Sequence, residues 1–343
     1  MISFLIKPAS SMCNMKCSYC FYCDEAQSRE KASLGFMSKE TAENIIKKAA
    51  QFSREATFVF QGGEPLLAGV DFFESFAKKA DDYGIKAHYA IQTNGTLIDE
   101  KYLSFFKKRN VLLGISLDGV ESVHNVFRKT PDGNGTYKKV FENIKTVQKE
   151  GIEFNILTVV TPEACQNIEE IYCFYMENGF YFQQYIPCID EMDSEQSVLT
   201  NSEYADFLKK LFTLYFNDRQ KGVPVSIRYF DNLIMKLNGI PAEQCGMNGN
   251  CSIQLVVEGD GTVYPCDFYC IDGKELGNIN SHQLTELLNC KNARAFIQDN
   301  HIDIKCKECK FFSICAGGCK RYRAEGTNKF CQAYKEFFEF SLG

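Results

Sequence analysis

The chain has 343 residues, which is enough for one large α/β domain and a smaller second one. Its formal net charge of −6 and its scattered lysines and arginines exclude a general attraction to nucleic acid or to anionic membranes. No apolar run is long enough to span a bilayer, and no signal peptide is visible. We therefore expect a soluble, cytoplasmic protein.

Cysteine is far more frequent than in an average cytoplasmic chain. The sequence contains 17 cysteines, an odd number, without an export signal. Disulfides are typical of secreted proteins, whereas clustered cysteines in a reducing compartment favour metal sites. Iron centres held by many thiolates would be oxygen-sensitive, so we expect an anaerobic host.

The first two thirds of the chain alternate short β-rich runs with longer amphipathic stretches. Strands are predicted at 3–6, 57–60, 87–92, 111–116, 153–160 and 182–186. Helices are predicted from Ser38 onward and at 70–83, 99–108, 137–150, 162–178 and 202–219. Such alternation predicts parallel strands with right-handed crossovers. Six units are too few for the eight-fold barrel, so the pattern predicts a partial (β/α)6, TIM-like barrel.

The alternation stops near residue 236, and ten of the 17 cysteines lie from Cys245 onward. Short strands at 253–257 and 262–264 are joined by a predicted hairpin turn at 258–261. Short helices are predicted at 284–288 and 293–298, with a terminal helix at 335–341. A segment with so little apolar core of its own depends on metal for its fold. The predicted domains are residues 1–235, the barrel, and 236–343, a cysteine-rich extension.

Four motifs follow the first four predicted strands. They are a cysteine loop at 13–20, Gln-Gly-Gly-Glu-Pro at 61–65, Thr-Asn-Gly-Thr at 93–96 and Leu-Asp-Gly at 117–119. Barrels of parallel strands carry their active sites at the carboxyl ends of the strands. We therefore expect all four motifs to lie together at one active-site opening. In the second motif the glycines allow a backbone to approach a ligand closely, and Glu64 and Pro65 fix the loop.

The cysteine loop places Cys13, Cys17 and Cys20 within eight residues. Thiolates are soft ligands that suit an iron–sulfur cluster or zinc. A closed site normally has four protein ligands, so three leave one metal position open for chemistry. A zinc knuckle and ordinary buried thiols are the alternatives. Cys23 could also act as a fourth ligand, which would close the site.

Eight cysteines of the tail fall into spaced sets and are enough for two four-ligand sites, although zinc ribbons also use such pairs. They are Cys245, Cys251, Cys266, Cys306, Cys309, Cys315, Cys319 and Cys331. Six cysteines remain, and buried thiols that pack as small apolar groups are the default interpretation for them. They are Cys23, Cys165, Cys173, Cys188, Cys270 and Cys290.

These motifs together resemble a known superfamily. A CxxxCxYC loop followed by GGEP resembles the radical S-adenosylmethionine (SAM) enzymes, and the tail resembles a SPASM domain with two auxiliary clusters. More narrowly, nearly the whole chain resembles the anaerobic sulfatase-maturating enzymes. The stretches that carry this resemblance are 5–11, 60–65, 92–100, 225–231, 245–249 and 263–269.

The resemblance implies three [4Fe–4S] clusters and SAM as cofactors. Cys13, Cys17 and Cys20 would hold the cluster whose fourth iron binds SAM. The SAM contacts would be Tyr19, Gly63, Ser116, Arg128 and Ile189. The first auxiliary cluster would be held by Cys245, Cys251, Cys266 and Cys319, and the second by Cys306, Cys309, Cys315 and Cys331.

The implied reaction begins with hydrogen abstraction by a 5′-deoxyadenosyl radical from Cβ of a cysteine, or serine, in a sulfatase peptide. Loss of a proton and a second electron then leads to Cα-formylglycine. Asp267 would be the base, and its alternative is a structural aspartate bonded to backbone amides. Tyr22 and Gln61 are candidate substrate contacts. The partners would be an unfolded or nascent sulfatase and a ferredoxin- or flavodoxin-type electron donor.

Two other functions share the same motifs. The first is a SPASM enzyme that modifies a ribosomal peptide by thioether formation or epimerisation. The second is a non-catalytic electron carrier with three closed clusters. Eight well-spaced tail cysteines argue against a thioether-forming enzyme that keeps an auxiliary iron open for the peptide thiol.

Overall fold

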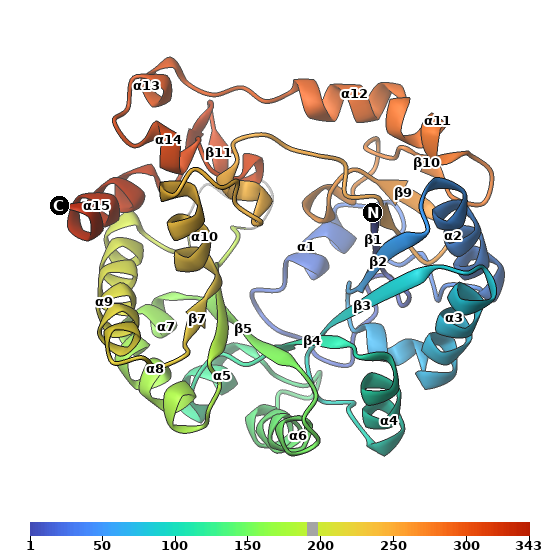
Figure 1. Cartoon of the computed structure of the whole chain (residues 1–343), viewed down its shortest axis with the longest axis horizontal. Coiled ribbons are helices and arrows are strands. Elements are labelled where there is room, and N and C mark those ends of the chain that lie inside the picture. Colours follow the sequence, from blue (N-terminus) through green and yellow to red (C-terminus); the bar gives the residue numbers. More distant parts are fainter. Residues whose placement is uncertain (191–197) are drawn as a thin grey trace. The chain divides into compact units, whose positions relative to one another are not determined.

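The computed structural model describes residues 1–190 and 198–343, and it divides the chain into two compact units (Figure 1). The first unit comprises 1–117, 125–154 and 253–296. The second comprises 118–124, 155–252 and 297–343.

The first unit is built on a sheet whose parallel strands β1 to β4 follow chain order. These strands are β1 (Ile2–Ile6), β2 (Glu55–Phe60), β3 (Lys86–Thr93) and β4 (Leu112–Ser116). The predicted hairpin extends the sheet beyond β1, because β8 pairs parallel to β1 and antiparallel to β9. The additional strands are β8 (Val256–Val257), β9 (Thr262–Tyr264) and β10 (Gly277–Asn278).

Helices α2 (Lys39–Phe52), α3 (Val70–Asp82) and α4 (Glu100–Arg109) lie along one side of these strands and bury their apolar faces (Figure 1). The other helices of the unit are α1 (Phe21–Gln27), α6 (Tyr137–Lys149), α11 (Leu284–Asn289) and α12 (Lys291–Gln298), with 3-10 turns η1 (Pro65–Ala68) and η3 (Asp267–Tyr269). The predicted caps are present: Ser38 accepts from the backbone N–H of Thr41 at the start of α2, and Asp99 accepts from Tyr102 at α4.

The second unit contains three parallel strands, β5 (Phe154–Val160), β6 (Phe182–Pro187) and β7 (Ser226–Ile227). Its helices are α7 (Pro162–Gln166), α8 (Ile168–Glu177), α9 (Asn201–Gln220), α10 (Arg228–Leu237), α13 (Ile304–Lys307), α14 (Phe312–Cys315) and α15 (Cys331–Leu342). Smaller elements are η2 (Cys245–Met247), η4 (Lys320–Tyr322), β11 (Arg323–Ala324) and β12 (Thr327–Asn328). Helix α5 (Glu121–Phe127) crosses the division between the units.

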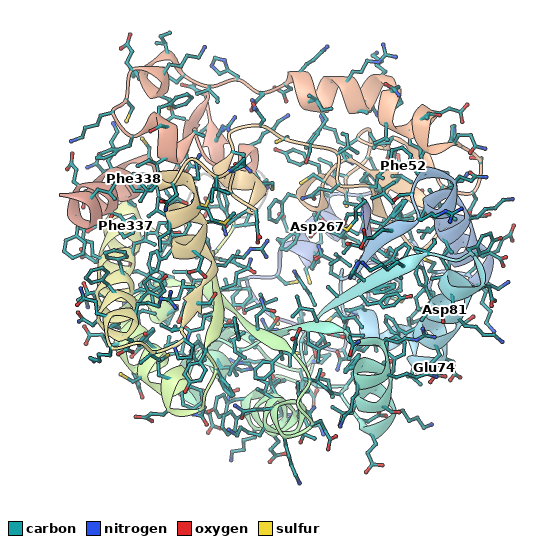
Figure 2. The ribbon with its side chains drawn as sticks, in the orientation of Figure 1. Phe52, Glu74, Asp81, Asp267, Phe337 and Phe338 are labelled. Atoms are coloured by element: carbon teal, nitrogen blue, oxygen red, sulfur yellow. The ribbon has the colours of Figure 1, made fainter. Side chains whose placement is uncertain are left out.

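Aromatic packing holds α15 to α9 and α10 in the second unit. Phe337 of α15 stacks on Phe230 of α10, with ring centroids 5.7 Å apart, and meets Phe212 of α9 edge-on at 5.6 Å. Phe337 and Phe338, labelled in Figure 2, are both buried. The terminal helix is therefore part of the core of this unit.

Several predicted boundaries differ from the structure. The helix expected at 162–178 is broken at Asn167, whose side-chain amide donates to the carbonyl of Glu163 and competes with the helix backbone. The terminal helix begins at Cys331 and not at residue 335. Helices α1, α5, α10, α13 and α14 and the seventh parallel strand, β7, were not predicted; β7 has only two residues and carries no periodic signal.

The predicted fold class is confirmed: the chain is an α/β protein with a partial barrel and a cysteine-rich extension. Its compact units do not divide at residue 235, because 253–296 packs with the first unit; the domain boundary stays a prediction. Among the described residues, no helix is long and apolar enough to cross a membrane.

Candidate functional site

The cysteine loop connects β1 to α1, and backbone hydrogen bonds fasten it to the end of α5 and to the segment that follows it. Lys16 N–H donates to the carbonyl of Lys129 at 2.8 Å, and Ser18 N–H donates to the carbonyl of Phe127 at 3.3 Å. Cys13, Cys17 and Cys20 are partly buried. The three thiols are therefore presented from a loop that the protein itself holds in place.

The loop after β3 reaches the first of these thiols. Asn94 Nδ2 lies 3.7 Å from Cys13 Sγ and donates to Asn14 Oδ1 at 2.9 Å. Asn14 Nδ2 in turn donates to Thr96 Oγ1 at 2.8 Å. The sequence analysis predicted only that this motif follows a strand and lies near the other motifs. The structure shows that its asparagine, Asn94, orders the cysteine loop.

The Gly-Gly-Glu-Pro loop after β2 packs directly on the start of the cysteine loop. Gly63 N–H donates to Ser10 O at 2.9 Å, and a Cβ on Gly63 would lie 2.1 Å from Met12 O. Any side chain at position 63 would collide with the backbone of Met12, so the packing of these two loops alone requires a glycine here.

Glu64 fixes the same loop, as the sequence predicted. It is fully buried and accepts from the side chain of Thr93 at 2.8 Å and from the backbone N–H of Asn94 at 2.7 Å. Burial raises the pKa of Glu64 to about 7, although these donors oppose the shift. Three of the four motif loops thus meet at one edge of the sheet. The fourth, at 117–119, crosses into the second unit, where Asp118 accepts from Val159 N–H.

Two of the predicted SAM contacts touch each other. Arg128 is 6% exposed, which excludes a surface charge, and its Nη1 donates to the hydroxyl of Tyr19 at 2.9 Å. Tyr19 also packs on Phe127, with ring centroids 5.4 Å apart. Ser116 ends β4 in the same unit. Ile189 lies in the second unit, directly after β6 and Cys188.

Cys23 lies on α1, next to the cysteine loop. A hydrogen bond from the Cys23 thiol lowers the pKa of Cys20 to about 6, whereas burial raises the pKa of Cys13 to about 12. Cys23 thus contacts Cys20 as a hydrogen-bond donor. Its place among the six cysteines outside the cluster sets stays a prediction.

Asp267, in the turn η3 directly after Cys266, lies beside α1 and is 8% exposed (Figure 2). Its Oδ2 accepts from the hydroxyl of Tyr22 at 2.8 Å and from Gln61 Nε2 at 2.7 Å. Its Oδ1 lies 3.2 Å from the ammonium of Lys7. The described partners of the carboxylate are thus side chains, which disfavours the alternative that Asp267 is a structural residue bonded to backbone amides.

Lys7 belongs to a larger buried charge network that the sequence did not reveal. Its Nζ lies 3.5 Å from Glu25 Oε2 and 3.6 Å from Glu258 Oε1. Glu258 Oε1 also accepts from Arg29 Nη1 at 2.9 Å. Burial alone would lower the pKa of Lys7, but the surrounding acidic groups raise it well above its ordinary value. The signal available in the sequence was only a lysine directly after a mostly apolar strand.

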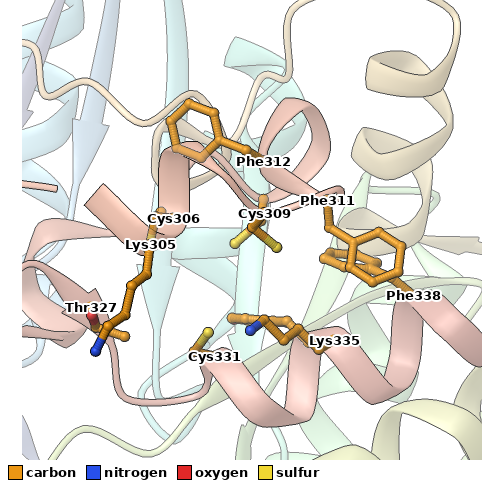
Figure 3. Close-up of a pocket in the computed structure, with 12 residues that line it drawn as sticks. Lys305, Cys306, Cys309, Phe311, Phe312, Thr327, Cys331, Lys335 and Phe338 are labelled. Carbon is orange, nitrogen blue, oxygen red and sulfur yellow. The ribbon is translucent and has the colours of Figure 1, made fainter. Parts of the chain in front are cut away.

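The second unit contains a cavity of about 140 Å³ that is lined by four predicted ligands of one cluster: Cys306, Cys309, Cys315 and Cys331. Figure 3 shows Cys306, Cys309 and Cys331 facing this space, with the side chains of Lys305 and Lys335 at its sides. Within 1–190 and 198–343, no three His, Cys, Asp or Glu side chains converge closely enough for one metal ion. Four thiols around a cavity fit a multinuclear cluster better than a single zinc.

The other predicted auxiliary set is divided between the units. Cys245, Cys251 and Cys319 belong to the second unit, whereas Cys266 belongs to the first. The segments of Cys245 and Cys319 are adjacent, since a Cβ on Gly246 would lie 3.1 Å from the Cβ of Cys319.

The default interpretation was that the six remaining cysteines are buried, but the structure buries only some of them. Cys165, Cys188 and Cys270 are buried, whereas Cys23 and Cys173 are exposed. Cys290 is partly buried, and its Sγ accepts from Ala293 N–H at the start of α12. The interpretation is therefore wrong for Cys23 and Cys173.

Comparison with protein families identifies two regions. Residues 8–174 match the radical SAM superfamily, and residues 245–310 match an iron–sulfur cluster-binding domain of the SPASM type. The first region contains the cysteine loop and the Gly-Gly-Glu-Pro loop, and the second begins at Cys245.

Individual proteins are similar over nearly the whole chain. A cysteine-type anaerobic sulfatase-maturating enzyme of Clostridium novyi is 43% identical over 99% of this chain and 95% of its own length. A serine-type enzyme of Bacteroides thetaiotaomicron is 26% identical over 98% of this chain and 88% of its own length.

Solved structures agree with this relationship. The structure of native anSMEcpe with bound AdoMet matches with a TM-score of 0.95 at 40% identity and covers 100% of this chain and 97% of that chain. The same protein with AdoMet and the Cp18Cys peptide also has a TM-score of 0.95, covering 99% of this chain and 96% of that chain. Together with the motif loops and the cysteine-lined cavity, this similarity shows that the chain belongs to the anaerobic sulfatase-maturating enzymes of the radical SAM superfamily.

Proposed function

We propose that this enzyme oxidises the cysteine of a sulfatase peptide to Cα-formylglycine, and that Asp267 is the base that receives the proton of the substrate thiol. The observation that carries the proposal is the environment of Asp267. Its carboxylate is held by Tyr22, Gln61 and Lys7 in the same compact unit as the cysteine loop. A carboxylate fixed in this way can accept a proton without first reorganising.

The donor sets of the chain fit SAM and three [4Fe–4S] clusters, the cofactors of this family. Cys13, Cys17 and Cys20 would supply three thiolates and leave one iron for SAM, with Tyr19 and Arg128 as proposed contacts of SAM. Cys306, Cys309, Cys315 and Cys331 line a cavity and would supply all four ligands of one auxiliary cluster. The proposed ligands of the other are Cys245, Cys251, Cys266 and Cys319. Gly63, Ser116 and Ile189 complete the proposed contacts of SAM.

When bound, these groups supply the radical that removes a hydrogen atom from Cβ and accept the electron that the substrate then loses. The chain's own side chains handle the proton. The S–H bond of the substrate breaks, its proton moves to the Asp267 carboxylate, and a C=S bond forms. Burial raises the pKa of Tyr22 well above its ordinary value, so its hydroxyl remains a neutral donor to Oδ2. Water then replaces sulfur to give the aldehyde and hydrogen sulfide.

Cysteine is the proposed substrate residue because the cysteine-type relatives are 41–43% identical to this chain, whereas the serine-type relatives are 26–28% identical. Two peptides that differ only in cysteine or serine at the target position test the choice. Mass spectrometry after anaerobic turnover should show replacement of CH2–SH by CHO in the first peptide. Faster conversion of the serine peptide would contradict the proposal.

The role of Asp267 is tested by Asp267→Asn, which keeps the shape of the side chain and removes the base. We expect about 10²- to 10⁴-fold less formylglycine, the usual contribution of a positioned base, with SAM cleavage retained. Gln254→Leu is a matched control, because it removes only the hydrogen bond between Gln254 Oε1 and the backbone N–H of Asp267. Unchanged aldehyde formation by Asp267→Asn would exclude the proposed base.

The electron partner that we propose is an acidic ferredoxin- or flavodoxin-type carrier, acting in a reducing cytoplasm where thiolate-bound clusters persist. It is supported by exposed lysines around the cysteine-lined cavity. Lys305 and Lys335 line it, and Lys307 is on the same short helix as Lys305. Among the described residues, none of the three forms an ion pair with a carboxylate, in a protein of net charge −6. Supplying a reduced ferredoxin or flavodoxin as the only electron source tests this partner. If neither carrier supports turnover of an enzyme that turns over with a small chemical reductant, the proposal is contradicted.

A further inference from the structure

We propose that Lys7 is a positioning residue for the oxidation, which holds the carboxylate of Asp267 in its reactive orientation through the contact between Nζ and Oδ1. This inference rests on the proposed function of Asp267 as the base. Lys7 does not need to touch the substrate or a cofactor. It acts by fixing the side chain that receives the proton.

The two oxygens of Asp267 are held from different directions. Tyr22 and Gln61 donate to Oδ2, at 2.8 and 2.7 Å. The described contact of Oδ1 is the ion pair with Lys7 at 3.2 Å. Without Lys7, two donors on one oxygen would leave the carboxylate free to rotate about its own axis, because no second point of attachment would resist the rotation.

Lys7 is itself rigidly placed. It directly follows β1, its backbone N–H donates to the carbonyl of Val257 at 2.8 Å, and it is 1% exposed. Its ammonium also lies 4.8 Å from the centre of the Tyr22 ring. The same lysine therefore contacts both Asp267 and one of the side chains that donate to it.

The charges around Lys7 make it possible to test its positioning role separately from its contribution to charge balance. When all are ionised, Lys7 and Arg29 carry two positive charges, and Glu25, Glu258 and Asp267 carry three negative ones, so the sum is −1. Replacing Lys7 by methionine shifts this sum to −2. A further Glu25→Gln change restores −1 but cannot restore the contact to Oδ1. A double variant therefore distinguishes a specific contact from simple compensation of buried charge.

The test measures how much formylglycine forms for each SAM molecule cleaved. If Lys7 positions the base, Lys7→Met should lower this ratio at least tenfold while SAM is still cleaved, and Lys7→Met combined with Glu25→Gln should remain as low. Lys7→Arg keeps the charge and should recover part of the ratio. Affinity for a fluorescently labelled cysteine peptide should change less than threefold, because Lys7 is 1% exposed and its ammonium is engaged with buried carboxylates.

Lys48→Met is the matched control. Lys48 is another buried lysine of the first unit, and its ammonium donates to the carbonyl of His282, away from Asp267. It should keep the wild-type ratio. A wild-type ratio in Lys7→Met, or full recovery in the double variant, would overturn the proposal. Should Lys7→Met not fold, the double variant and Lys7→Arg still decide the question.

The Asp267→Asn variant keeps the two proposals distinguishable. If Asp267→Asn still forms aldehyde, the base assignment fails, whatever Lys7→Met does. If Asp267→Asn loses aldehyde and Lys7→Met does not, only the inference about Lys7 fails.

Discussion

The network around Asp267 and the cavity around Cys309 are two polar sites built in opposite ways. At Asp267, two cations and three carboxylates already neutralise most of one another inside the first unit. At the cavity, four cysteines face a space, and the neighbouring lysines are exposed. The first site balances most of its charge with protein side chains, whereas the second leaves a space that a further group can occupy.

The secondary structure that supports the two sites also differs. Asp267 and Lys7 are supported by the sheet, since Lys7 follows β1 and Glu258 follows β8. The four cysteines lie on α13, on the turn after it, on α14 and at the start of α15, and α13 and α14 have four residues each. Such short helices are marginal by themselves. We infer that a bound cluster stabilises this part of the second unit, while the base network folds without one.

The largest expected effect is on the clusters themselves. Cys13→Ala, Cys17→Ala and Cys20→Ala combined should abolish SAM cleavage but change the free energy of unfolding by less than about 1 kcal/mol, because backbone hydrogen bonds hold that loop. Cys306→Ala and Cys309→Ala combined should cost several kcal/mol, within the ~10 kcal/mol that a complete structural zinc site can supply to a small domain.

Anaerobic urea unfolding, iron analysis and measurement of 5′-deoxyadenosine check this contrast. Cys173→Ala, which changes an exposed cysteine of α8, is the control for the loss of a thiol as such. Equal losses of stability for the two sets of cysteine variants would show that the two regions do not differ in this way.

The two regions also differ in how well the sequence predicts them. Cysteine spacing identified eight tail cysteines as candidate ligands, because cluster ligands follow a local pattern, and the family resemblance assigned the four residues of the cavity to one cluster. The helices with clear periodicity and caps, such as α2 after Ser38, were also predicted. Lys7, Glu25 and Glu258 could not be found in this way. Glu25 follows Lys7 by 18 residues, and Glu258 follows Glu25 by 233. Only the pairing of β8 with β1 brings Glu258 to Lys7.

A smaller effect is expected from pH on the Asp267 network. Burial raises the pKa of Glu25 to about 7 from its ordinary value of 4.5, although Lys7 and Arg29 oppose the shift. The folded state therefore binds this proton more tightly than the unfolded state, and the contribution of Glu25 to stability falls as the pH rises from about 4.5 to about 7. The size of this effect is about 3 kcal/mol.

Glu25→Gln should remove that dependence. The difference in free energy of unfolding between the variant and the wild type should change in favour of the variant as the pH is raised from 5 to 7. Other groups with raised pKa values, such as Glu64, contribute equally to both proteins and cancel in the difference. Parallel pH profiles for the two proteins would contradict the assignment of this titration to Glu25.

The smallest expected effect concerns the lysines of the cavity, which lack the buried partners of Lys7. Lys305→Gln combined with Lys335→Gln should slow reduction by an acidic ferredoxin roughly fivefold to tenfold at low ionic strength, because exposed charges steer association. The two rates should converge as salt is added, since the interaction is screened beyond about 10 Å at 0.1 M salt. Lys78→Gln with Lys108→Gln, on α3 and α4 of the first unit, is the control that changes net charge by the same amount. An equal slowing by this control pair would mean that net charge, and not the cavity lysines, governs the encounter.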